Sequence, residues 1–253
     1  MRRELRAFLN LALAHFVVLE LLLIVAIVWW PNFEESLGGI KKLAKLPVLA
    51  KQVDLIEMYG VGAYVVGQHY FKACNTLGAA AAVLFAMNAV AGEAHRGTLE
   101  IWLARPVTRT RLYTERWVLG QLAIALPVLI TSLTIPPLLR TVDANMAYGP
   151  LVACSIHQSL FLGALFSLTF LFSTFSINPL KIALGMLFVS IFQFAIYMVK
   201  TLTDWSLFRL VDIQAYVNIL NSGKLSVPTT AVLIAANLAF YAVGLAIFKR
   251  HIP

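Results

Sequence analysis

The sequence predicts an all-α integral membrane protein with six transmembrane helices, and three observations lead to this fold class. First, 60% of the 253 residues are apolar and 13% are charged, with a mean hydropathy of +0.81, whereas a soluble domain has roughly 45–50% apolar and about 25% charged residues. Second, the apolar residues gather in six long runs. Third, no stretch between these runs is long enough for a second domain. A soluble enzyme, a disordered chain and a disulfide-rich secreted module are therefore excluded.

Six windows are long enough to cross a hydrocarbon core of roughly 30 Å, which takes about 20 residues in a helix. Helices are expected because unpaired backbone groups cannot face lipid, and no window alternates in the way a barrel strand does. The chain is thus interpreted as a single membrane domain over 1–253. Its spans are expected at about 9–30, 73–92, 117–139, 151–173, 182–199 and 229–248.

The distribution of basic residues predicts the orientation of the spans. Six spans put both termini on one side of the membrane. The segments on that side carry 11 Lys and Arg residues, and the opposite segments carry 9 although they are nearly twice as long. Because positive charge is enriched in cytoplasmic loops, both termini are expected in the cytoplasm. The protein itself is expected in the inner (cytoplasmic) cell membrane. No basic stripe with interleaved aromatic residues is present, so nucleic acid is not an expected partner.

The longest segment between spans, 32–71, is expected on the outer side. From Pro47 onward apolar residues recur at helical spacing, which predicts an amphipathic helix on the outer membrane surface. Gly60, Gly62 and Gly67 are expected to interrupt the chain before the second span.

Motifs for catalysis and nucleotide binding are absent. The sequence contains no G-x-x-x-x-G-K-[ST], no H-E-x-x-H and no G-x-S-x-G, so neither a P-loop ATPase nor a familiar hydrolase is indicated. The two cysteines, Cys74 and Cys154, have no metal-ligand spacing. They fall near the same end of two windows, so a disulfide is conceivable, but two free buried thiols are the favoured interpretation.

Three polar residues within the windows are candidates for a translocation path. Glu20 is the only acid well inside any window; a charge there is costly, so it is expected to be protonated, paired or facing a cavity. His157 and Gln158 make the fourth window unusually polar, which suggests that it faces protein or a pathway. The alternative is that these side chains hold neighbouring helices together by hydrogen bonds, and the sequence leaves both interpretations open.

The segment 93–116, between the second and third windows, predicts a short helix on the inner side. Gly97 breaks the preceding helix, Thr98 stands where a cap is needed, and Glu100 favours the positive end of a new helix. An apolar face follows, and Arg105-Pro106 stops the helix because a residue before proline avoids the α conformation. The face is formed by Leu99, Trp102 and Leu103. On physical grounds alone, an ordinary interfacial helix among basic residues is the favoured interpretation.

The same segment carries a family resemblance. Its sequence is Glu93-x-x-Arg96-Gly97-Thr98-Leu99-Glu100, then Leu103-Ala104-Arg105-Pro106-Val107-Thr108-Arg109. This pattern resembles the inner loop of bacterial ABC transporter permeases of the exporter-type class, and the chain length, the six spans and the basic N-terminal stretch agree. In that family the loop is the coupling element that docks on a separate ATPase. The resemblance implies coupling roles for Glu93, Arg96, Gly97, Thr98, Leu99, Glu100, Trp102, Leu103, Arg105 and Pro106.

The resemblance also implies partners. Two permease copies, expected as a homodimer within membrane lipid, would pair with two cytoplasmic ATP-binding cassette subunits. ATP and Mg would bind to those subunits and no cofactor to this chain, which would be a transport permease and not an enzyme. Met1–Asn10 would form an interfacial elbow helix. The competing hypotheses are a proton-coupled secondary carrier and an intramembrane enzyme, both centred on Glu20.

Overall fold

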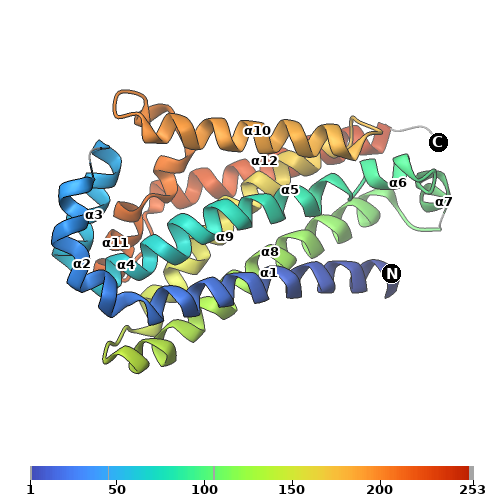
Figure 1. Ribbon diagram of the computed structural model, residues 1–253. Coiled ribbons are helices and arrows are strands. Elements are labelled where there is room, and N and C mark those ends of the chain that lie inside the picture. The colour runs from blue at the N-terminus through green and yellow to red at the C-terminus, as the bar shows by residue number, and fades with distance from the viewer. Residues whose placement is uncertain (1, 45, 105, 251–253) are drawn as a thin grey trace.

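The bundle of this protein is built from helices. The computed structural model describes residues 2–44, 46–104 and 106–250, and it contains no strand within them. Figure 1 shows long helices lying side by side, with small helices gathered at both ends. The first helix begins and the last helix ends at one end of the bundle, where α6 (Ala91–His95) and α7 (Leu99–Leu103) also lie.

Six helical segments of the described residues are long and apolar enough to cross a membrane. The prediction of an all-α membrane protein with six spans is therefore confirmed. The spans are α1 (Arg2–Val28), a composite second span, α8 (Arg109–Leu139), α9 (Tyr148–Ser173), α10 (Pro179–Met198) and α12 (Val227–Arg250). The second span consists of α4 (Val61–Val66), the π-helix η1 (Gly67–Gly78) and α5 (Ala79–Met87).

Short helices cover the end of the bundle opposite α6 and α7. These are α2 (Trp30–Leu43), α3 (Pro47–Tyr59), α11 (Ile213–Ser222) and the 3₁₀ turns η2 (Arg140–Val142), η3 (Thr203–Trp205) and η4 (Leu207–Val211). The helix predicted from Pro47 onward is α3, but Val53 and Ile56 on its apolar face are buried inside the protein. That face therefore packs on the rest of the chain, whereas the sequence predicted contact with a membrane surface.

The second span differs most from its predicted bounds. It begins at Val61 instead of 73 and ends at Met87 instead of 92. Of the three glycines expected to interrupt the chain, only Gly60 has a positive φ, of 61°, and the other two lie within helix. The span was underestimated because 67% of its most apolar stretch is buried, compared with 22% for α1. Polar side chains are tolerated where protein, and not lipid, surrounds them.

The predicted elbow helix over Met1–Asn10 is not a separate element. The helix α1 runs without interruption from Arg2 to Val28, and Met1 lies outside the described residues. No glycine or proline falls between these bounds, so nothing in the sequence breaks the helix before the span. The later spans also begin before their predicted windows, at Arg109, Tyr148, Pro179 and Val227.

The centre of the bundle is α9, which packs against α5, α8 and α12. Its side chains Leu162, Phe166 and Phe170 are fully buried. Helices α8 and α9 approach closely at Gly120, because a Cβ atom built there would overlap the Phe166 ring. The absence of a side chain at this position therefore sets the distance between the two helices.

Replacing Gly120 with alanine should therefore destabilise the bundle by about 1–3 kcal/mol, the usual cost of overpacking a core. The matched control is Gly185→Ala in α10, because nothing lies within 4 Å of a Cβ atom there. The control should be neutral or stabilising, since glycine in a helix interior costs up to about 1 kcal/mol. Thermal unfolding of the detergent-solubilised variants tests this difference, and equal midpoints would refute the close-packing argument.

Candidate functional site

The turn between α6 and α7 places the predicted coupling residues at one end of the bundle. Gly97 has a φ of 68°, in the left-handed region that favours glycine, so it ends α6 as predicted. Thr98 comes directly before α7, and its backbone N–H donates to the Glu93 carbonyl oxygen at 2.9 Å. The Thr98 hydroxyl also donates back to Glu93. Thr98 thus stands at the start of α7, with its side chain turned towards α6.

Glu93 is the centre of a charged cluster. Arg96 Nη2 donates to its Oε1 at 2.7 Å, the Thr98 hydroxyl donates to its Oε2, and Arg116 Nη2 lies 3.6 Å from Oε1. Burial by itself would raise the pKa of the Glu93 carboxyl. The hydrogen bonds from Thr98 and Arg96, together with the charge of Arg116, outweigh burial and lower that pKa below its usual value. Glu93 is therefore ionised at neutral pH and joins α6, α7 and α8.

Two residues that the sequence analysis missed hold the chain between α5 and α6. The buried Arg116 on α8 donates to the carbonyl oxygen of Ala89. The Ser173 hydroxyl at the end of α9 accepts from the backbone N–H groups of Val90 at 3.1 Å and Ala91 at 2.9 Å. The loop is thus attached to two spans. Arg116 gave a weak signal in the sequence, because it resembles any basic residue at the inner end of a span.

The short helix α7 turns Leu99 and Leu103 of its predicted apolar face inward. Leu99 and Leu103 are partly buried and pack against the hydrophobic core, so they cannot form an outward docking face. The exposed residues are Glu100 and Ile101, and the Ile101 side chain is 66% exposed. Pro106 is also exposed, whereas Arg105 and the side chain of Trp102 lie outside the described residues.

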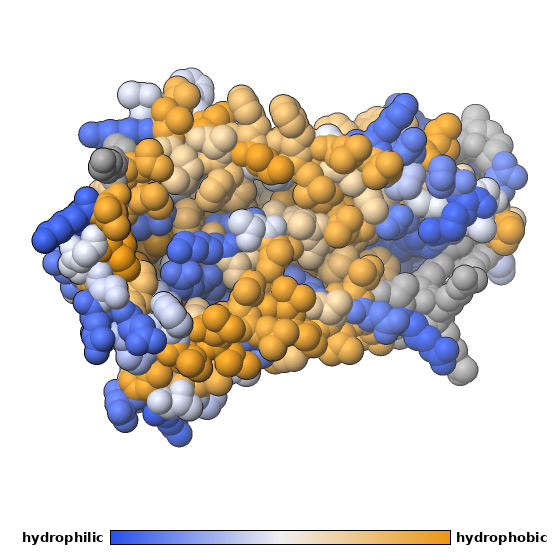
Figure 2. All heavy atoms as spheres, in the orientation of Figure 1, coloured by the Kyte–Doolittle hydropathy of each residue, from blue (hydrophilic) through white to orange (hydrophobic). Residues whose placement is uncertain are grey.

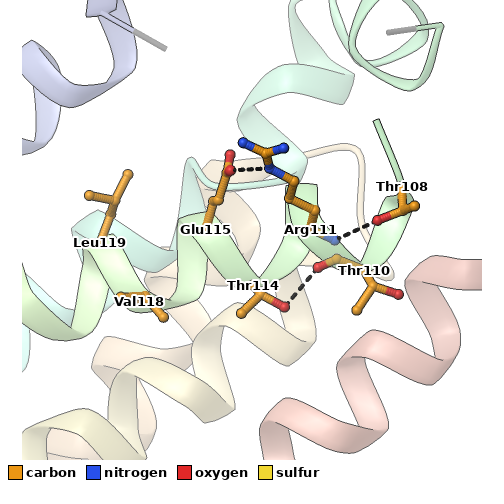
Figure 3. Close-up of a pocket in the computed structure, with 7 residues that line it drawn as sticks. All are labelled: Thr108, Thr110, Arg111, Thr114, Glu115, Val118 and Leu119. Atoms are coloured by element: carbon orange, nitrogen blue, oxygen red, sulfur yellow. Dashed lines mark hydrogen bonds and ion pairs between the residues drawn. The ribbon is translucent and has the colours of Figure 1, made fainter. Parts of the chain in front are cut away.

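A groove of about 630 Å³ lies beside this segment, along the first turns of α8 (Figure 3). Thr108 caps α8 by accepting from Arg111 N at 3.3 Å, and Arg111 Nε pairs with Glu115 at 2.7 Å. Figure 3 shows this ion pair at the groove, with Val118 and Leu119 one turn further along α8. The lining residues are Thr108, Thr110, Arg111, Thr114, Glu115, Val118 and Leu119. The same end of the bundle therefore offers a recess as well as the exposed residues Glu100 and Ile101 of α7.

The three polar residues proposed for a translocation path do not meet in one site. Glu20 accepts a hydrogen bond of 2.9 Å from Thr134 on α8. His157 Nε2 lies 2.7 Å from the carbonyl oxygen of Leu210 in η4. Each bond joins two elements of the bundle.

Gln158 belongs to a further set of contacts. Its Nε2 donates to Asn75 Oδ1 at 2.9 Å, and its Oε1 accepts from the Tyr216 hydroxyl. Gln158 therefore contacts η1 and α11, whereas Glu20 on α1 contacts Thr134 on α8. They support the alternative in which such residues hold helices together.

Comparison with known proteins now assigns the family. A family model described as "ABC-2 family transporter protein" matches residues 2–251. The chain belongs to the ABC-2 transporter family. It is thus a multi-pass ABC transporter permease, as its inner-loop pattern indicated, and such permeases work with ATP-binding cassette subunits. No curated protein matches the chain significantly.

The cysteines of this ABC-2 permease are not paired. Cys74 in η1 and Cys154 in α9 are both buried and free, which agrees with the interpretation favoured from the sequence. Among the described residues, His, Cys, Asp and Glu side chains do not form a group of three that could hold a metal ion. The notable polar features of the permease are the Glu93 cluster and the hydrogen bonds between its spans.

Proposed function

We propose that this ABC-2 permease is the membrane-spanning subunit of an ATP-driven exporter of the inner cell membrane, with both termini in the cytoplasm. Two copies form a homodimer and pair with two cytoplasmic ATP-binding cassette ATPases. ATP and Mg bind to those ATPases and not to this chain, so the permease itself is not an enzyme. The family match over residues 2–251 is the observation that carries this proposal.

The α6–α7 segment is the proposed coupling element. It lies at the same end of the bundle as the start of α1, where positive charge favours the cytoplasm. Arg116 connects it to α8, and Ser173 connects it to α9. A displacement of the segment by the closing ATPases would therefore reach two spans directly, because rigid packed elements move together.

The alternatives centred on Glu20 gain no support from its surroundings. A secondary carrier or an intramembrane enzyme needs that carboxyl at a site with other reactive groups. Its hydrogen-bonding partner is the hydroxyl of Thr134, which stabilises the contact between α1 and α8. The family match favours ATP-driven transport over both alternatives.

The exposed face of α7 provides the test of coupling. The double variant Glu100→Arg with Ile101→Asp reverses one charge and adds another on this face without changing a core residue. We expect its affinity for the partner ATPase to fall at least about tenfold, which corresponds to about 1.4 kcal/mol. Affinity is measured by co-purification and titration of the tagged permease in detergent.

Two controls separate docking from folding. Glu35→Arg in α2, at the opposite end of the bundle, should bind the ATPase as the wild type does. Leu103→Asp places a charge against the core and should lower the yield of folded protein. If the folded double variant still binds the ATPase with full affinity, the coupling assignment of α7 is wrong.

A further inference from the structure

A second groove, of about 400 Å³, lies between α1 and the second span. Its two walls differ in chemistry. One wall is apolar and aromatic, and it is formed by Leu22, Val25, Ala26, Trp29 and Phe33, while Tyr64 of α4 closes the groove from the second span. The other wall belongs to η1 and carries Gln68, Lys72 and Thr76 beside Ala73.

The polar side chains of η1 form a stripe. Gln68, Lys72 and Thr76 recur every four residues, so they share one side of the helix. Figure 2 shows a hydrophilic patch within the apolar surface, over the helix that runs from α4 towards α5 in Figure 1. The patch therefore lies on the face of a membrane span and not at the ends of the bundle.

Lys72 lies inside the second span and not at either of its ends. The second span runs from Val61 to Met87, so Lys72 is two residues from the midpoint at position 74. An ionisable side chain inside a membrane span is costly and is commonly functional. The outer end of the groove is lined by aromatic rings. The rings of Phe33 and Tyr64 lie 4.7 Å apart, and the Tyr64 hydroxyl donates to the Ala26 carbonyl oxygen at 3.0 Å.

No described acidic side chain neutralises Lys72. Asp54 and Glu57, the acids of the outer helix α3, pair with Lys41, while Glu20 binds Thr134 on α8. Lys72 forms no ion pair within the part of the chain that the structure describes, and its side chain is exposed in the groove. A positive charge in a mostly apolar recess is complementary to a negative group that carries a hydrocarbon tail.

We propose that this groove binds an acidic amphiphile from the bilayer. The phosphate or carboxylate of its head group lies against the Lys72 ammonium and accepts a hydrogen bond from the Gln68 amide. Its hydrocarbon chain packs along the apolar wall of α1. The proposal concerns binding from the membrane and is independent of ATP-driven export.

The experiment measures lipid bound to the purified permease by native mass spectrometry. The probe is phosphatidylglycerol, compared with phosphatidylcholine of the same chains and with inorganic phosphate. We expect phosphatidylglycerol to bind to the wild type in preference to the other two. Lys72→Gln should weaken its binding about tenfold, because one charge-assisted hydrogen bond is lost. Lys72→Arg should retain it.

Two further variants keep the test decisive. Lys200→Gln removes an exposed lysine just after α10 and should leave binding unchanged. Val25→Trp fills the groove from an exposed position on α1 while keeping Lys72, and it should also weaken binding. If Lys72→Gln does not fold, the Val25→Trp variant still tests whether the groove binds the lipid.

Three outcomes would overturn the proposal. The first is equal binding of phosphatidylglycerol to the wild type, Lys72→Gln and Val25→Trp. The second is equal affinity for inorganic phosphate, because the tail would then contribute nothing. The third is a Lys72→Gln variant that changes from dimer to monomer with lipid binding intact, which would assign the groove to the contact between two copies. None of these results depends on the ATPase.

Discussion

Replacing Arg116 with methionine is expected to lower the free energy of unfolding by about 3 kcal/mol. Removing one partner of a buried ion pair typically costs about 3–5 kcal/mol. The low end applies because Glu93 keeps its hydrogen bonds from Arg96 and Thr98. The Arg116 side chain is only 6% exposed, so water cannot replace its contacts with Glu93 and the Ala89 carbonyl oxygen. In thermal unfolding of the detergent-solubilised permease, the midpoint should fall by roughly 6–12 °C.

Arg111 is the matched control for Arg116. It lies on the same helix and pairs with Glu115, but its side chain is 64% exposed. An exposed helical ion pair is worth about 0.3–0.5 kcal/mol, so Arg111→Met should hardly change the midpoint. Glu93→Gln combined with Arg116→Met should cost less than the sum of the two single variants if the side chains act together. An equal loss in Arg111→Met and Arg116→Met would contradict the importance of burial.

Arg116 also separates the two interpretations of the loop. If α6 and α7 form an ordinary interfacial helix, Arg116→Met affects stability alone. In the proposed function, the variant loosens the attachment of the coupling element to α8. The folded fraction of the variant should then bind the ATPase through the intact exposed face of α7, while its ATP hydrolysis no longer responds to the permease. This combination of retained docking and lost coupling is specific to the proposed function.

The spans were predictable to the extent that lipid contact determines their composition. The helix α1 is the most apolar span, and only 22% of its most apolar stretch is buried. Most of its side chains are therefore available for contact with lipid, which requires a long run of apolar residues that is easily found in the sequence. The second span was mispredicted by 12 residues at its start because it is largely enclosed by protein. There Gln68, His69 and Lys72 interrupt the apolar run without ending the helix.

The position of the loop helix was predictable from the sequence, but its tertiary partners were not. The sequence located the break at Gly97 and the short helix after it, because the left-handed conformation of a glycine is a local property. The helical spacing also put Leu99 and Leu103 on one apolar face, and both pack inward while Ile101 faces outward. Glu93 pairs with Arg116 on α8, and Glu20 accepts from Thr134 on the same helix. Both contacts depend on tertiary packing, which the spacing of residues along the chain does not encode.

Replacing Gln158 with leucine is expected to destabilise the permease by about 3 kcal/mol, although leucine suits a membrane span. Gln158 is fully buried and connects three elements. It accepts from the Tyr216 hydroxyl of α11 and donates to Asn75 of η1, which in turn donates to the Val211 carbonyl oxygen at 3.2 Å. Leucine would leave the Tyr216 hydroxyl and the Asn75 carbonyl oxygen without partners, and each such group costs about 1–3 kcal/mol.

The double variant with Tyr216→Phe tests whether this role is structural. Tyr216→Phe alone leaves Gln158 Oε1 without its donor and should also destabilise the fold. Removing both partners together should cost less than the sum of the single changes, because an apolar pair leaves fewer unsatisfied groups. Thermal unfolding of the two single variants and the double variant measures this coupling. A residue of a translocation path would instead tolerate leucine without loss of stability, so an unchanged midpoint in Gln158→Leu would return Gln158 to the candidate path.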